Sequence, residues 1–264
     1  MHAGATSALA EMDYWLTDDV LHPEHTSEQF TEALFRLPNF YIFPPLDNAP
    51  AVSPLPAETN GFVTFCSFIK PCKINDDVLD RWAEILSAVP DSRLLLKFKN
   101  LLDVPSLRQG ILGRLHLGGI APERISLLSG VDAIHDHLGL YGQADISLDT
   151  FPFAGATTTF QSLWMGVPVV SLMTDRFIGR AGGSFSVHAG LGELAAETPA
   201  DYVEAAVALA GDIARLKELR KTLRARVENS VLCDRPKYAA NVECAYRSMW
   251  QTHASGGNNF PPAP

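Results

Sequence analysis

The chain has few charged residues and no surplus of positive charge. Charged residues make up 19% of its 264 residues, which is low for a solvated helical bundle but normal for a buried parallel sheet. Acidic residues outnumber basic ones, 30 to 21, and the formal net charge is -9. A general nucleic-acid or anionic-membrane surface needs a broad basic field. We therefore expect no nucleic acid and no membrane as partner, while a local anion pocket remains compatible with this charge.

Neither the cysteines nor the hydrophobic runs indicate secretion or a membrane. No pair of the four cysteines has Cys-x-x-Cys spacing, and a chain of this length needs no disulfide framework. The N-terminus lacks the basic and apolar regions of a signal peptide. The most apolar stretch, 163–173, is interrupted by Gly166 and Pro168 and falls short of the ~20 residues that span a bilayer. We expect free thiols and a cytoplasmic protein.

From residue 61 the sequence alternates short apolar runs with amphipathic segments. The apolar runs predict buried strands at 62–68, 92–99, 124–129, 144–150 and 168–173. The segments between and after them predict helices at 75–90, 105–118, 132–143, around 157–166, at 199–230 with a break near Gly211, and at 237–250. Strands that alternate with helices indicate an α/β fold, with a Rossmann-like parallel sheet that carries helices on both faces.

The two ends of the chain are less regular. The segment 26–37 predicts a helix, with Thr26 or Ser27 as its cap, and the stretch after it is rich in proline. We interpret the proline-rich stretch, up to about residue 60, as a linker or a strap packed over another surface, 61–250 as the main lobe and 251–264 as a disordered tail.

Three loops of the predicted sheet carry polar groups that suit a phosphorylated ligand. Ligands of such sheets bind beyond the carboxyl ends of the strands. The loops there contain Lys70 and Lys73, then His135 and His137, and then three consecutive threonines, 157–159, at the start of a helix. Ammonium groups and a helix N-terminus with free N–H groups suit a pyrophosphate.

Each of these groups also has a simpler explanation. Loop lysines are usually just solvated. Two residues apart on a helix, His135 and His137 point to different faces, so we expect no metal site. One hydroxyl of Thr157–Thr159 is enough to cap a helix, and the others would then be β-branched filler. Asp149, at the end of a strand, could merely close the next turn.

Longer strings resemble one enzyme family. The strings are "GATSALAEMDYWLTDD" (4–19), "FCSFIKPCKINDDVLDRWAEILSAVPDSRLLLKFK" (65–99) and "LYGQADISLDTFPFAGATTTFQSLWMGVPVVSL" (140–172). They resemble the O-linked N-acetylglucosamine transferases, glycosyltransferase family 41, with its bacterial and SPINDLY-like members. The resemblance implies a GT-B fold of two Rossmann-like lobes, of which this chain is the C-terminal, nucleotide-sugar-binding one, at 61–250 with a final helix that crosses back to the first lobe. By the same resemblance, 1–60 is the end of the acceptor-side lobe and a proline-rich linker. It further implies an inverting transfer from UDP-N-acetylglucosamine, or another UDP-sugar, to Ser or Thr of proteins, with neither metal nor cofactor.

The resemblance also assigns roles to residues. Lys73 matches the catalytic lysine that neutralises the leaving diphosphate. His137 matches a histidine beside the uracil, and Thr157 and Thr158 match a pair that holds the phosphates. Gln161 stands where the family carries an acid for the ribose hydroxyls, and it would still bind the nucleotide sugar.

Other positions depart from the family pattern. Lys70, a further candidate for binding the nucleotide sugar, stands where an amide is usual. Ala156 and Ile134 replace residues that are often histidine and basic, respectively.

Two functions from different classes remain open. The first is the donor-binding half of a protein O-glycosyltransferase, which we expect to be inactive alone because the acceptor-side lobe and its preceding tetratricopeptide repeats are missing. The second is a non-catalytic nucleotide-sugar-binding or interaction module; a UDP-sugar epimerase of GT-B fold has no motif support. A helix stripe consists of Tyr238, Val242, Tyr246 and Met249. We expect part of this stripe and the strap 40–45 to be uncovered without a first lobe, which favours self-association or a partner. The alternative is that the stripe folds back onto the donor lobe itself.

Overall fold

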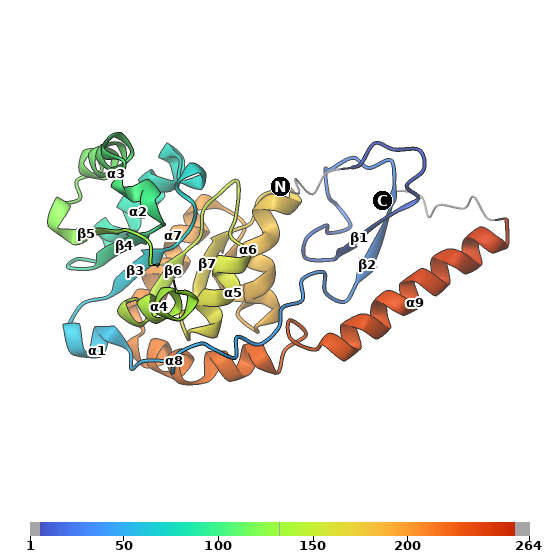
Figure 1. Cartoon of the computed structure of the whole chain (residues 1–264). Helices are drawn as coiled ribbons and strands as arrows, with labels where there is room; N and C mark the ends of the chain where they lie inside the picture. The colour runs from blue at the N-terminus through green and yellow to red at the C-terminus, as the bar shows by residue number, and fades with distance from the viewer. Residues whose placement is uncertain (1–5, 132, 257–264) are drawn as a thin grey trace.

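The computed structural model describes residues 6–131 and 133–256, and its main feature is a six-stranded parallel sheet (Figure 1). The strands lie in the order β5-β4-β3-β6-β7-β8, and each neighbouring pair is parallel. Their bounds are β3 (Thr64–Ser67), β4 (Arg93–Lys97), β5 (Ile125–Leu128), β6 (Ile146–Leu148), β7 (Val169–Leu172) and β8 (Ala195–Ala196). The direction in which strands are added reverses between β3 and β6, as in the Rossmann fold, so the predicted fold class is confirmed.

Helices pack on both faces of the sheet. On one face α2 (Asp76–Ala88) contacts α3 (Pro105–Leu117) and α7 (Pro199–Gly211). On the other face α5 (Thr157–Trp164) contacts α6 (Phe177–His188) and α8 (Ile213–Glu228) (Figure 1). Two short helices, α1 (Pro56–Asn60) and α4 (Ile134–Gly139), precede β3 and β6. None of the helices in the described ranges is both long and apolar enough for a bilayer.

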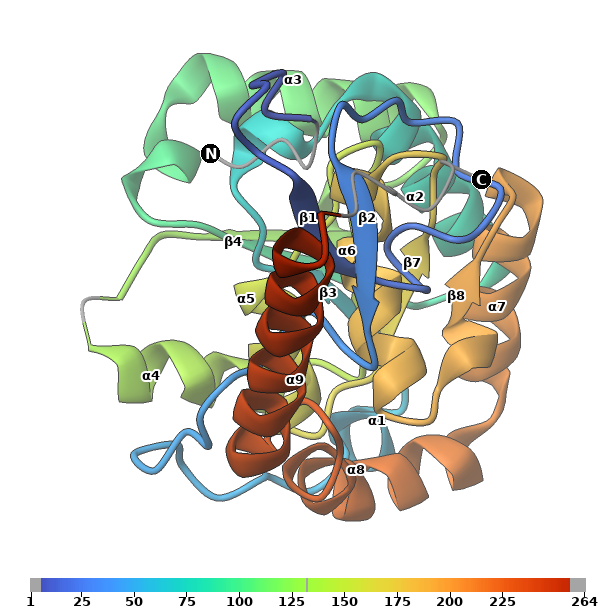
Figure 2. The ribbon, with the colours of Figure 1, turned by 90° about the vertical axis from the view of Figure 1, so that its right-hand side faces the viewer.

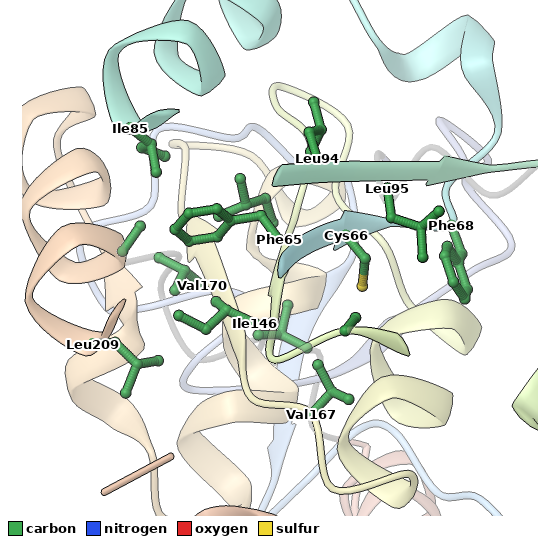
Figure 3. Close-up of a cluster of buried hydrophobic side chains, with 14 of the residues drawn as sticks. Phe65, Cys66, Phe68, Ile85, Leu94, Leu95, Ile146, Val167, Val170 and Leu209 are labelled. Carbon is green, nitrogen blue, oxygen red and sulfur yellow. The ribbon is translucent and has the colours of Figure 1, made fainter. Parts of the chain in front are cut away.

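The core lies between these layers and is built from side chains of the strands and of the helices that pack on them, such as Ile85 of α2 and Leu209 of α7 (Figure 3). Every residue of β3, β6 and β7 is buried, and apart from threonine and serine these strands contain only apolar residues and one cysteine, without a charged side chain. Cys66, in the centre of β3, is fully buried, and burial raises the pKa of its thiol to about 12. All four cysteines are free thiols, as expected.

Helix α2 follows its sequence signals closely. The Asn75 side chain accepts the Val78 N–H at 2.9 Å and caps the helix, with two aspartates in the first turn. Leu79 and Trp82 are buried, as predicted. Trp82 Nε1 also donates to the Tyr202 hydroxyl of α7 at 3.0 Å, which joins the two helices of this face.

The predicted helix at 26–37 is wrong. Residues Ala33–Leu37 form β2, which pairs in parallel with β1 (Tyr14–Asp18) in a separate two-stranded sheet. The preceding residues, 26–32, are neither helix nor strand. Pairing with β1 satisfies the backbone of this segment, so tertiary contacts outweigh its helical pattern.

Helix α6 was not predicted, because its sequence contains glycines at 179, 182 and 183 that usually interrupt helices. In the fold these glycines let α6 approach the sheet. A Cβ added at Gly182 would lie 1.7 Å from Asp149 Oδ2. In contrast, the predicted break near Gly211 is confirmed, since α7 ends there and Asp212 caps α8 through the Arg215 N–H at 2.9 Å.

The expectation that the strap at 40–45 is uncovered is wrong. Tyr41 stacks on Phe185 of α6, with ring centroids 4.8 Å apart. Phe43 stacks on Phe160 of α5 at 4.6 Å, and its N–H donates to the Leu232 carbonyl at 2.8 Å. The strap is therefore part of the layer that covers α5 and α6.

The last helix, α9 (Arg235–Ala254), leaves the large lobe and runs beside β2 (Figure 2). Its stripe is covered unevenly, because Tyr238, Val242 and Met249 are partly buried, whereas Tyr246 is 59% exposed. The helix continues through Ala254, so the prediction of a disordered tail is wrong for 251–254. The rest of that prediction concerns residues up to 264, of which 257–264 lie outside the described residues.

Candidate functional site

The loops after β3 and β6 meet where the strand order reverses. Lys73 Nζ, from the first loop, donates to the Ala154 carbonyl of the second at 2.7 Å. Asn75 Nδ2 donates to the Phe151 carbonyl at 2.9 Å. The Lys73 ammonium also lies 3.7 Å from the centre of the Phe153 ring, a cation–π contact. The two contacts of Lys73 fix its ammonium group, and the Asn75 contact joins the two loops, at the edge of the sheet where ligands of this fold bind.

The buried carboxylate of Asp149 holds the loop after β6 in place through hydrogen bonds. Its Oδ1 accepts the N–H groups of Thr150 at 2.8 Å and Gly155 at 2.7 Å, and its Oδ2 accepts the Ser171 hydroxyl at 3.0 Å. Burial raises the pKa of Asp149 to about 6, although these hydrogen bonds and the charge of Lys73 act in the opposite direction. Burial likewise lowers the pKa of Lys73, and Asp149 opposes that change. Asp149 thus shapes the loop that leads into α5.

The start of α5 has no side-chain cap. The residue before the helix, Ala156, cannot supply one, and no threonine hydroxyl caps it. The alternative of one cap plus filler is therefore wrong. Thr157 is exposed, Thr158 partly buried and Thr159 buried. The first N–H groups of a helix have no partner within it, so this end can receive an anion.

His137 lies between a lysine and a glutamine. Its Nδ1 is 2.7 Å from Lys97 Nζ of β4, and its Nε2 is 3.1 Å from Gln161 Oε1 of α5. Burial lowers the pKa of His137, and the charge of Lys97 lowers it further. His135 instead is exposed and faces Asp136. Within 6–131 and 133–256, no three His, Cys, Asp or Glu side chains cluster in a way that could hold a metal ion.

A cavity of about 260 Å³ connects His137 to the start of α5. Its lining includes Phe68, Lys97, Lys99, Ile134, His137 and Thr158. The Tyr141 hydroxyl donates to the Thr158 carbonyl at 3.1 Å and ties the two walls together. A larger cavity of about 530 Å³ lies at the opposite, amino end of β3 and β4, beside Thr64 and Arg93, away from these groups.

The structure thus brings most of the predicted residues to one edge of the sheet. Lys73 contacts the loop before α5, while His137, Gln161 and Thr158 surround or adjoin the cavity. The Lys70 side chain is exposed and makes no hydrogen bond or ion pair in the described part of the chain, although the Lys70 carbonyl accepts the Lys73 N–H at 3.0 Å. Sequence reasoning missed Lys97, whose signal was a charged residue directly after three leucines at the carboxyl end of a strand.

Comparison with known proteins gives a consistent result. The sequence model of glycosyl transferase family 41 matches residues 54–242. A tomato protein (Solanum lycopersicum), a probable UDP-N-acetylglucosamine–peptide N-acetylglucosaminyltransferase SPINDLY, is 44% identical over 95% of this chain and 27% of its own length. Its Arabidopsis thaliana counterpart is 42% identical over 95% of this chain and 28% of its own.

A solved structure confirms the fold. A mutant of the O-GlcNAc transferase from Thermobaculum terrenum superposes with a TM-score of 0.83 and 37% identity, over 94% of this chain and 47% of that chain. The large sheet is thus a Rossmann-like lobe of a GT-B glycosyltransferase. The chain spans about a quarter of the length of the plant relatives. On the family match and on this identity along nearly its whole length, the chain belongs to glycosyl transferase family 41.

Proposed function

We propose that this chain is the donor-binding half of an inverting, metal-independent protein O-glycosyltransferase. Its nucleotide sugar is a UDP-sugar, with UDP-N-acetylglucosamine as the first candidate because the printed names of the plant relatives specify it. One observation carries the proposal: Lys73 is fixed across the point where the strand order reverses, next to the uncapped start of α5. A diphosphate there would meet an ammonium group and free backbone N–H groups together.

The chemistry follows from this placement. The diphosphate is the leaving group, and its negative charge grows as the bond to the sugar breaks. The contact with Lys73 strengthens as that charge grows, so it stabilises the transition state more than the ground state. Thr157 and Thr158 hold the phosphates through N–H and hydroxyl groups. The nucleoside then extends toward His137 and Gln161, and the acceptor Ser or Thr attacks the anomeric carbon from the side opposite the diphosphate.

Binding of UDP tests the proposal directly. Calorimetry of the 264-residue chain with UDP should show saturable heat, and uridine should bind more weakly because it lacks the groups that Lys73 and α5 contact. Circular dichroism serves as the control for folding. A folded protein that gives no heat at millimolar UDP would rule out the proposal.

The 264-residue chain by itself should bind UDP-sugar without transferring the sugar to protein. Transfer requires an acceptor hydroxyl held in line with the anomeric carbon and a proton acceptor nearby. In the described residues before α1 there are the two-stranded β1–β2 sheet and the strap, and no second Rossmann-like lobe that could position an acceptor. Labelling of a peptide or a lysate by the purified chain, dependent on UDP-N-acetylglucosamine, would contradict this expectation.

A non-catalytic nucleotide-sugar-binding module is the second candidate. The observation in its favour is Gln161, whose carbonyl oxygen is engaged by His137 at a position where the family resemblance implies an acid. Both candidate functions require UDP binding, but only the first includes transfer of the sugar to a protein. Both also allow a partner or a second copy to cover Tyr246 and Trp250 of α9, which are 59% and 68% exposed.

A further inference from the structure

Lys97 is a buried cation that pairs with no carboxylate among residues 6–131 and 133–256. Its side chain is 5% exposed at the end of β4, and no acidic group in the described part of the chain forms an ion pair with it. The nearby charge that acts on it is that of Lys99, which has the same sign. A buried ammonium group needs hydrogen-bond acceptors to offset its lost hydration. The acceptor that the structure provides is His137 Nδ1, at 2.7 Å.

This contact fixes which nitrogen of His137 carries the proton. An ammonium group has only N–H donors, so Nδ1 must accept and the neutral ring carries its hydrogen on Nε2. Nε2–H then donates to Gln161 Oε1, at 3.1 Å. The groups around the ring agree with a neutral form: Lys97 from β4 and Tyr141 after α4 carry no negative charge at neutral pH, and Asp136 of α4 is exposed.

The hydrogen bonds therefore run in one direction, from Lys97 through His137 to Gln161. Because the carbonyl oxygen of Gln161 is occupied by His137, its NH₂ group is the end left for a ligand. A carboxylate at this position would accept hydrogen bonds, whereas this amide donates them.

We propose that Lys97 is a positioning residue that, through His137, turns Gln161 so that its NH₂ group faces the bound nucleotide. The site then selects a nucleoside with an oxygen acceptor at that point, either a ribose oxygen or a base carbonyl. This rests on the proposed function, since it concerns the same nucleotide site. Lys97 itself acts on the orientation of Gln161 and takes no part in bond breaking.

Nitrogen NMR of the histidine side chains tests the first step without any ligand. His137, assigned by the signal lost in His137→Gln, should be protonated on Nε2 in the wild type. Lys97→Met should release that preference and give a mixture of tautomers, and Lys97→Arg should restore it because a guanidinium also donates. Lys99→Met, which removes the same charge from the same cavity, should leave the tautomer unchanged. Protonation on Nδ1 in the wild type, or an unchanged tautomer in Lys97→Met, would overturn the proposal.

Calorimetry tests the second step. Lys97→Met should weaken UDP binding about five- to tenfold, which corresponds to the net contribution of one hydrogen bond. Lys99→Met should weaken UDP binding less. Lys97→Arg should recover most of the loss. With 2′-deoxy-UDP, the wild type should lose affinity if Gln161 contacts the ribose and keep it if Gln161 contacts the base. Equal losses for the two Met variants would mean that charge alone matters and would refute the positioning role. Absence of UDP binding to the wild type would instead refute the proposed function and leave the NMR result intact.

Discussion

Asp149→Ala should lower the free energy of unfolding by about 3 kcal/mol or more, the largest loss of stability that we expect from a change at the site. The substitution removes the acceptor of three buried hydrogen bonds, from the N–H groups of Thr150 and Gly155 and from the Ser171 hydroxyl. It also removes the negative charge next to the partly buried Lys73. Urea denaturation followed by circular dichroism measures the change.

The matched control is Asp149→Asn. Its carbonyl oxygen can still accept the two N–H groups, and its amide can donate to Ser171, so it should cost far less than alanine. The ordinary pKa of 3.8 is raised to about 6 in the fold, so the folded protein binds this proton more tightly than the unfolded chain. The associated stability is present below about pH 4 and lost as the pH rises through about 6. As the pH falls from about 6 to about 4, the free energy of unfolding of the wild type should therefore rise relative to that of Asp149→Asn. Equal costs for Ala and Asn would show that the hydrogen bonds contribute nothing.

Lys73→Ala should weaken UDP binding about ten- to hundredfold, equivalent to about 1.5–3 kcal/mol for a charge-assisted contact. Lys73 is the cation that the fold holds in place, through the Ala154 carbonyl at 2.7 Å and the Phe153 ring. Its ammonium therefore needs little ordering when the diphosphate arrives. Calorimetry with UDP measures the loss, and circular dichroism confirms that the variant folds.

Lys70→Ala is the control from the same loop. Lys70 is exposed and unattached, so a diphosphate would have to immobilise it, and its removal should cost much less. Equal losses for the two lysines would show that the assignment of Lys73 to the diphosphate is wrong.

The sheet was predictable because its signals are local. The stretches that contain β3 and β7, 62–68 and 168–173, are mostly apolar, and both strands are buried along their whole length. Helices such as α2 carry their own cap, here Asn75. The failures occurred where distant contacts decide the structure. β2 is a strand because β1 lies beside it, and α6 tolerates its glycines because they permit a close approach to Asp149.

The location of the candidate site was predictable from the sequence, but the hydrogen bonds between its residues were less so. The rule that ligands bind at the carboxyl ends of strands placed Lys73, His137 and Thr158 at one edge. The sequence did not reveal that Lys97 faces His137, since residues 40 apart share no local pattern. Nor did it reveal that Asp149 holds the loop through Gly155, because strand-end aspartates often only close a turn.

The two hydrogen bonds that join the loops at the switch point also bear on the order of folding. Lys73–Ala154 and Asn75–Phe151 connect residues 81 and 76 positions apart, one from each half of the sheet. Closing such long loops costs chain entropy before any contact repays it. The half that contains β3, β4 and β5 and the half that contains β6, β7 and β8 must therefore dock before these bonds form. Neither half alone holds Lys73 in place, so the candidate anion site is complete only after both halves have folded and docked.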